Sequence, residues 1–252
     1  MIRELNNPFR EDIEKIIIDK IESLTNKKID SLYNVQDTLG ESWFDIKDTS
    51  FQTKIGTELY ILDENNPIYI NLLYDISQQL DMDFYFQKTA TIRAHPYDWD
   101  RTYWYHLDTS HFNQHPDQLN VMLPITTEHF YFSLVPKWFT KLIQYITNND
   151  VHKMDKTKFR ENHTWFRKIC RWLAKDYYTL DDILIWGSND HLHCALPRNN
   201  TNRFSFDMRI LPMEHDTSYK WDNSIFNYRR GDFTYKPGDF FSSKTIRETI
   251  NN

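Results

Sequence analysis

The segment 203–211, RFSFDMRIL, constrains the fold of this chain more strongly than any other. Its apolar and polar residues alternate strictly, and a period of two is typical of a β-strand with one buried face. One face would carry Phe204, Phe206, Met208 and Ile210, and the other would carry Arg203, Ser205, Asp207 and Arg209. Such a strand suits a sheet whose apolar face covers a core and whose charged face lines a polar pocket.

The hydrophobic spacing changes at about residue 83, from the period of helices to the period of strands. Before this point we predict helices at 8–24 and 68–81, with short strands at 43–46 and 58–62. After it we predict strands at 84–94, 102–108, 118–126, 183–187 and 203–211, and helices at 137–148 and 157–176. The sequence therefore predicts an α+β protein with a mainly β core, formed as a single domain over 1–252. Residues 1–82 would be mostly helical support, and 83–240 would hold the β core with a helical insert at 137–176.

Composition excludes several classes of protein. The chain has only five glycines, and no two lie closer than seven positions, so it lacks a dinucleotide-binding turn and a P-loop. A net charge of −6 without a long basic stretch argues against binding to duplex nucleic acid. Two cysteines cannot build a disulfide framework, and the apolar runs are too short for a signal peptide or a membrane span. We expect a cytoplasmic protein without a membrane partner, and its oligomeric state stays open.

The segment TYWYHLD at 102–108 carries the first candidate metal ligands. In a strand, residues two apart share a face, so His106 and Asp108 would project together, with Trp104 on the same side. One imidazole beside one carboxylate is two thirds of the 2-His-1-carboxylate triad that holds non-haem Fe(II). A second histidine would have to come from another part of the chain, and His191 and His193 are the candidates.

A second motif follows these histidines. Arg203 lies ten residues after His193 and begins the alternating strand, with Ser205 on the same face. Charge directed into a pocket needs a partner, and a dicarboxylate supplies one because arginine binds carboxylates through two hydrogen bonds. The chain resembles the Fe(II)/2-oxoglutarate-dependent oxygenases in the order of three motifs: HLD, a distal histidine and Arg-Phe-Ser. HCALPRNNTNRFSFDMRILP and the later YRRGDFTY resemble the phytanoyl-hydroxylase-like branch, and within it the streptomycin-biosynthesis-type and sporadic carbohydrate-cluster enzymes.

The resemblance covers about 83–240 and implies a fold, a cofactor and residue roles. The fold would be a double-stranded β-helix, that is, a cupin-like jelly roll with supporting helices. The cofactor would be Fe(II), with 2-oxoglutarate and O2 as cosubstrates. His106, Asp108 and His193 would hold the iron, and His191 is the competing distal ligand. Arg203 and Ser205 would bind the far carboxylate of 2-oxoglutarate, and Asn120 on the strand QLNVM is a candidate for its other end, or is simply a strand-bonding residue.

Substrate contacts are predicted from the residues around the HLD motif. Trp104, Trp99 and His111 are candidates, because an indole ring can stack on a sugar or another ring. The alternative is that these aromatic residues are structural and that the histidine lies in a surface loop. Residues 151–176 carry eight lysines and arginines against three acids, which indicates either a solvated helix face or attraction of an anionic substrate.

The function that these features favour is a dioxygenase that hydroxylates a small polar molecule, such as a carbohydrate or a natural-product precursor, and releases succinate and CO2. Two other classes stay open at this point. One is a non-catalytic cupin-like protein that binds a metal or a small molecule. The other is a zinc hydrolase that uses the same three ligands, although Arg203 and Ser205 would then have no role.

Overall fold

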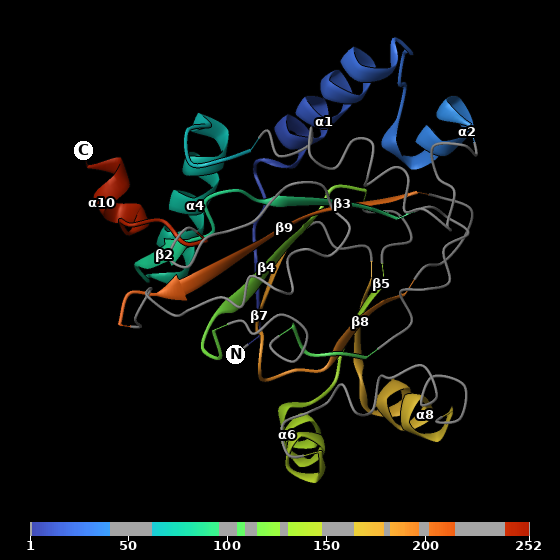
Figure 1. Ribbon diagram of the computed structural model, residues 1–252, viewed down its shortest axis with the longest axis vertical. Coiled ribbons are helices and arrows are strands. Elements are labelled where there is room, and N and C mark those ends of the chain that lie inside the picture. Colours follow the sequence, from blue (N-terminus) through green and yellow to red (C-terminus); the bar gives the residue numbers. More distant parts are fainter. Residues whose placement is uncertain are drawn as a thin grey trace.

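The computed structural model of the chain contains two antiparallel β-sheets with helices on either side (Figure 1). It describes residues 2–40, 62–95, 105–108, 115–126, 131–147, 164–178, 182–196, 202–214 and 240–251. The helices are α1 (Arg10–Thr25), η1 (Leu32–Asn34), α2 (Val35–Leu39), α4 (Pro67–Leu80), α6 (Lys137–Ile146), α8 (Thr164–Leu173) and α10 (Ile246–Ile250). The strands are β1 (Ile2–Leu5), β2 (Phe84–Phe86), β3 (Thr91–His95), β4 (Leu119–Pro124), β5 (Tyr131–Leu134), β6 (Lys175–Tyr178), β7 (Ile183–Gly187), β8 (His193–Leu196) and β9 (Arg203–Pro212). The protein is therefore α+β with a mainly β core, as the sequence predicts.

The larger sheet has six strands, and β9 is the strand that connects most of them. Its order is β1-β7-β4-β9-β2, and β3 also pairs with β9. All of these pairs are antiparallel. Asn120 of β4 lies opposite Arg209 of β9 and opposite Trp186 of β7, so side chains from three neighbouring strands meet on one face of the sheet.

The other face of the large sheet is apolar and packs against the N-terminal helices. Phe204, Phe206, Met208 and Ile210 are fully buried in the same cluster as residues of α1 and α4. Helix α4 begins where Pro67 occupies the first turn and the Asn66 side chain accepts hydrogen bonds from the free backbone N–H groups. Because α1 and α4 are amphipathic, they supply the apolar layer that this face of the sheet requires.

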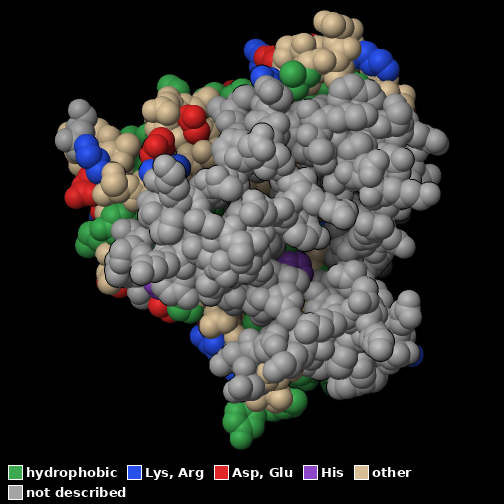
Figure 2. All heavy atoms as spheres, viewed as in Figure 1, with side chains coloured by type: hydrophobic (Ala, Val, Ile, Leu, Met, Phe, Trp, Pro, Cys, Tyr) green, Lys and Arg blue, Asp and Glu red, His purple; other side chains and the backbone are tan. Residues whose placement is uncertain are grey.

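The smaller sheet, in the order β6-β5-β8, packs on the charged face of the large sheet at one end. Met122, Leu184 and Trp186 of the large sheet share a buried cluster with residues of β5 and β6, namely Phe132, Leu134 and Tyr177. On its far side the small sheet is covered by α6 and α8, which bury Phe139, Ile143, Phe166 and Cys170. Helix α6 turns Trp138 and Tyr145 outward, 62% and 85% exposed, and apolar side chains are visible at this end of the surface in Figure 2.

Several elements differ from the sequence prediction, and each difference has a local cause. The predicted strand 84–94 is two strands, β2 and β3, which pair with successive parts of β9. The predicted helix 157–176 ends at Leu173, because residues 175–178 form β6 and pair with β5. The strand predicted at 43–46 and residues 58–61 of the next lie outside the described residues, as do residues 151–163 of the basic segment. In the part of the chain that the structure describes, no helix combines the length and hydropathy needed to cross a bilayer.

Candidate metal centre

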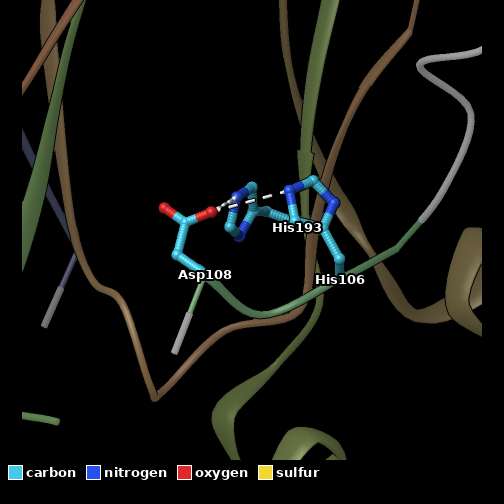
Figure 3. Close-up of side chains that lie close together, drawn as sticks. All are labelled: His106, Asp108 and His193. Atoms are coloured by element: carbon cyan, nitrogen blue, oxygen red, sulfur yellow. Dashed lines mark ion pairs between the residues drawn. The ribbon is translucent and has the colours of Figure 1, made fainter. Parts of the chain in front are cut away.

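Three side chains converge between the two sheets: His106, Asp108 and His193 (Figure 3). Asp108 Oδ1 lies 3.6 Å from His106 Nε2 and 3.5 Å from His193 Nε2. One ligand atom from each residue lies within 4.8 Å of the other two. Asp108 and His193 are buried and His106 is 30% exposed, so the cluster is accessible from the His106 side.

The backbone holds the two histidines together. His106 and His193 exchange two N–H···O hydrogen bonds of 3.0 Å, so a short bridge joins the HLD segment to β8. Tyr105 and Leu107 point the opposite way and belong to the apolar cluster under α6 and α8. The strand predicted at 102–108 is only this isolated bridge among the described residues 105–108, yet His106 and Asp108 still face the same side, as alternation predicts.

His193, and not His191, belongs to this cluster. The Nδ1 atom of His193 lies 3.2 Å from the backbone oxygen of His191, and its Nε2 faces Asp108. The Phe132 and Trp186 rings lie 5.6 and 5.3 Å from the His193 ring, centroid to centroid, and restrict its orientation. His191 is directed elsewhere, with Nδ1 2.9 Å from the Val135 carbonyl oxygen, and burial lowers the pKa of its imidazole.

The second oxygen of Asp108 contacts other residues. Asn120 Nδ2 donates to Oδ2 at 2.8 Å, and Arg209 Nη2 donates to the same atom at 3.0 Å. Ser188 donates to the Asn120 side-chain oxygen at 3.0 Å. Burial alone would raise the pKa of Asp108, but the positive charge of Arg209 and the two neighbouring imidazoles outweigh burial and hold this pKa well below its usual value. The carboxylate is therefore ionised at neutral pH.

This donor set fits a divalent transition metal. Two imidazole nitrogens and one carboxylate oxygen face one another across a gap of a few ångströms, and these are the donor types of the non-haem Fe(II) triad. An ionised carboxylate is the form that binds a cation. Among the described residues, no other group of three histidine, cysteine or acidic side chains has this geometry.

The other polar side chains on this face of β9 are those of Arg203, Ser205 and Asp207, which precede Arg209 along the strand. Arg203 is buried, and desolvation, only partly offset by Asp207, lowers the pKa of its guanidinium to about 10. The group is still charged at neutral pH, so an anion placed beside it would gain a charge-assisted hydrogen bond. Ser205 donates to Asp207 at 3.0 Å, and Asp207 also forms an ion pair with Arg93 of β3.

The structure tests only some of the other site residues that the sequence predicts. The substrate candidates Trp99, Trp104 and His111 lie outside the described residues, as does YRRGDFTY. Asn120 was a candidate for 2-oxoglutarate; in the structure both halves of its amide are engaged, one with Asp108 and one with Ser188.

The sequence interpretation did not assign Ser188 and Arg209 to the cluster. Arg209 was visible as a member of the charged face of β9. Its position opposite Asn120 depends on the register between β4 and β9, which the sequence pattern does not determine.

The chain matches no protein-family model and no curated protein. A solved structure described as a non-heme monooxygenase, ThoJ–Ni complex, aligns over 99% of this chain and 88% of its own, with 10% identity and a TM-score of 0.38. The non-heme alpha-ketoglutarate-dependent epimerase SnoN from nogalamycin biosynthesis aligns over 72% of this chain and 70% of its own, with 10% identity and a TM-score of 0.39. Both TM-scores are below 0.5, so the assignment of function rests on the residues of the chain itself.

Proposed function

We propose that the protein is an Fe(II)- and 2-oxoglutarate-dependent dioxygenase that hydroxylates a small polar molecule. The observation that carries the proposal is the convergence of His106, Asp108 and His193, two of them buried, with one ligand atom of each within 4.8 Å of the other two. Two imidazoles and an ionised carboxylate in this arrangement provide a facial donor set and leave the opposite positions for other ligands.

The charged face of β9 supports the assignment of the cosubstrate. Arg203 is a buried cation on the same strand as Arg209, which contacts the cluster, and a guanidinium can bind a carboxylate through two hydrogen bonds. We assign the far carboxylate of 2-oxoglutarate to Arg203. Ser205 would be a second donor once its hydroxyl turns from Asp207 toward that carboxylate. The two face-to-face sheets agree with a double-stranded β-helix, which we propose as the connectivity of the β core.

When bound, iron would supply the redox chemistry, in which O2 is the oxidant and 2-oxoglutarate is oxidised to succinate and CO2. The residues of the chain have positioning roles. His106, Asp108 and His193 hold the metal, and the Phe132 and Trp186 rings beside His193 limit the access of water from that side.

The direct test is spectroscopic. The protein is purified without oxygen, Fe(II) and then 2-oxoglutarate are added, and the visible charge-transfer band of the chelated keto acid is measured. We expect the band in the unmodified protein and its absence in Asp108→Ala. Succinate should appear when O2 is admitted. Metal binding without the band would retain the metal centre and reject the cosubstrate.

The substrate class that we propose is a polar, ring-containing small molecule, neutral or anionic, such as a carbohydrate or a natural-product precursor. The aromatic residues flanking the HLD motif and the basic segment 151–176 motivate this choice. A screen of sugars, nucleotide sugars, amino acids and fatty acyl compounds for coupled succinate release tests it. If only long apolar acyl compounds stimulated succinate release, the proposed substrate class would be wrong and the dioxygenase assignment would stand.

A further inference from the structure

The two oxygens of Asp108 have different surroundings. Oδ1 faces His106 and His193 at 3.6 and 3.5 Å. Oδ2 faces away from them and accepts hydrogen bonds from Asn120 at 2.8 Å and from Arg209 at 3.0 Å. A carboxylate can bind a metal through one oxygen or through both, and the two modes leave different numbers of coordination positions open. The partners of Oδ2 therefore affect what the metal centre can accept.

We propose that Asn120 and Arg209 are positioning residues that keep Oδ2 away from the metal, so that Asp108 acts as a ligand through one oxygen. In a six-coordinate site, two histidines and a single carboxylate oxygen leave three positions, which are enough for a bidentate keto acid and one further ligand. If Oδ2 also bound, one of these positions would be lost. This inference rests on the proposed function, and it explains two buried polar groups that the proposed function does not use.

The two residues that donate to Oδ2 lie on neighbouring strands of the large sheet, and Ser188, which contacts one of them, lies next to a third strand. Asn120 and Arg209 face each other across β4 and β9, and both are buried. Ser188 directly follows β7 and donates to the Asn120 oxygen at 3.0 Å, which fixes the amide with its N–H group toward Asp108. Asp108 itself lies outside both sheets. Side chains of the large sheet therefore orient the carboxylate of a residue that belongs to a different segment.

Arg209 differs from the other arginines on this face of the sheet. Arg93 is paired with Asp207, and Arg203 lies toward the opposite end of β9. Among the ion pairs between described residues, Arg209 is the arginine that reaches a ligand of the cluster. Arg93→Met is thus a matched control: it removes one guanidinium from the same face without removing a contact to Asp108.

The experiment uses Co(II) as a spectroscopic probe of the full-length protein prepared without metal. Co(II) affinity and the visible d–d absorption bands are measured for the unmodified protein and for Arg209→Met, Asn120→Leu, Ser188→Ala and Arg93→Met. We expect affinity to fall about 10- to 100-fold in the first two variants, the range for lost partners of a metal ligand. We also expect their bands to change shape, because Asp108 gains the freedom to bind through both oxygens. Arg209→Lys should restore part of the spectrum, and Arg93→Met should leave it unchanged.

The outcomes separate this inference from the proposed function. Unchanged bands and affinity in Arg209→Met and Asn120→Leu, with normal Co(II) binding by the unmodified protein, would overturn the positioning role and leave the metal centre standing. Failure of the unmodified protein to bind Co(II) or Fe(II) would overturn both. If Arg209→Met and Asn120→Leu do not fold, as judged by circular dichroism, Ser188→Ala decides. It loosens the amide without leaving a buried charge, and an unaltered spectrum would overturn the inference.

Discussion

The two faces of β9 come from the same ten-residue strand and have opposite surroundings. One face places four apolar side chains, from Phe204 to Ile210, in the core beneath α1 and α4. The other carries Arg203, Ser205, Asp207 and Arg209, and Arg209 contacts a residue of the candidate metal centre. Because side chains alternate along a strand, the residues that stabilise the protein and those that serve the site are sequence neighbours with separate contacts. Substitutions on the two faces should therefore change different measured quantities.

The largest expected effect concerns the metal. His193→Ala and Asp108→Ala each remove one of three ligands, and Fe(II) affinity measured by anaerobic equilibrium dialysis should fall by more than about 100-fold, the upper end of what loss of an outer partner costs. The midpoint of thermal unfolding without metal should change little in His193→Ala. His191→Ala is the control, because its imidazole contacts the Val135 carbonyl and not the cluster. Loss of iron in His191→Ala with retention in His193→Ala would reverse the ligand assignment.

The apolar face should show the opposite result. Phe206 is fully buried and its ring lies 5.9 Å from the ring of Tyr69 in α4, edge to face. Phe206→Ala should lower the free energy of unfolding by about 3–5 kcal/mol, the usual cost of deleting a buried aromatic side chain. Urea unfolding measures this change. Co(II) affinity of the folded fraction should stay within twofold of the unmodified protein, and a large loss would mean that the two faces are coupled.

The next effect concerns the cosubstrate at the other end of the charged face. Arg203→Ala should weaken binding of 2-oxoglutarate to the Fe(II) protein more than tenfold, because a buried carboxylate without its partner costs roughly 2–5 kcal/mol. Titration of the charge-transfer band measures the affinity, and iron binding should persist. Arg247→Ala, which removes a partly exposed arginine near Asp81, is the control. Unchanged affinity in Arg203→Ala would transfer the role to Arg93.

The smallest expected effect is a pH dependence. The pKa of Asp108 in the folded protein lies well below its unfolded value of about 3.9, because Arg209 and the imidazoles outweigh the effect of burial. The ionised group therefore contributes stability above about pH 4, and this contribution is lost as the pH falls through the lower, folded pKa. Urea unfolding of the metal-free protein between pH 5 and 2.5 should show a steeper loss than in Asp108→Asn. Parallel curves would show that the pairing with Arg209 does not stabilise the fold.

The elements that the sequence predicts well are those with one clear hydrophobic period. Strict alternation predicted β9 and both of its faces, and the spacing of isoleucines and leucines predicted α1 and α4, because a single amphipathic period along each segment indicates its secondary structure. Strand β1 was not predicted, since four residues that pair with β7 carry no period of their own. Strand β6 was not predicted either. The helical spacing of apolar residues extends beyond Leu173, the last residue of α8, whereas residues 175–178 pair with β5.

The candidate site also has a part that the sequence predicts and a part that it does not. Alternation in TYWYHLD places His106 and Asp108 on one side, and the structure agrees for the residues that it describes. The contacts of Arg209 and Ser188 depend on which residues of β4, β7 and β9 lie opposite one another. A single sequence does not contain this information, because register is set by the packing of the whole sheet.

The central place of β9 has a consequence for how the protein forms during translation. Strands β2, β3 and β4 all pair with β9, and β1 pairs with β7, which is synthesised much later than β1. The large sheet therefore cannot be completed until the ribosome has passed residue 212. Pairings between distant segments are slow to form, and strands without their partners expose edges on which other chains can aggregate. His106 likewise meets His193 only after β8 has been synthesised. Any metal at this centre is therefore acquired by a chain that already extends past His193.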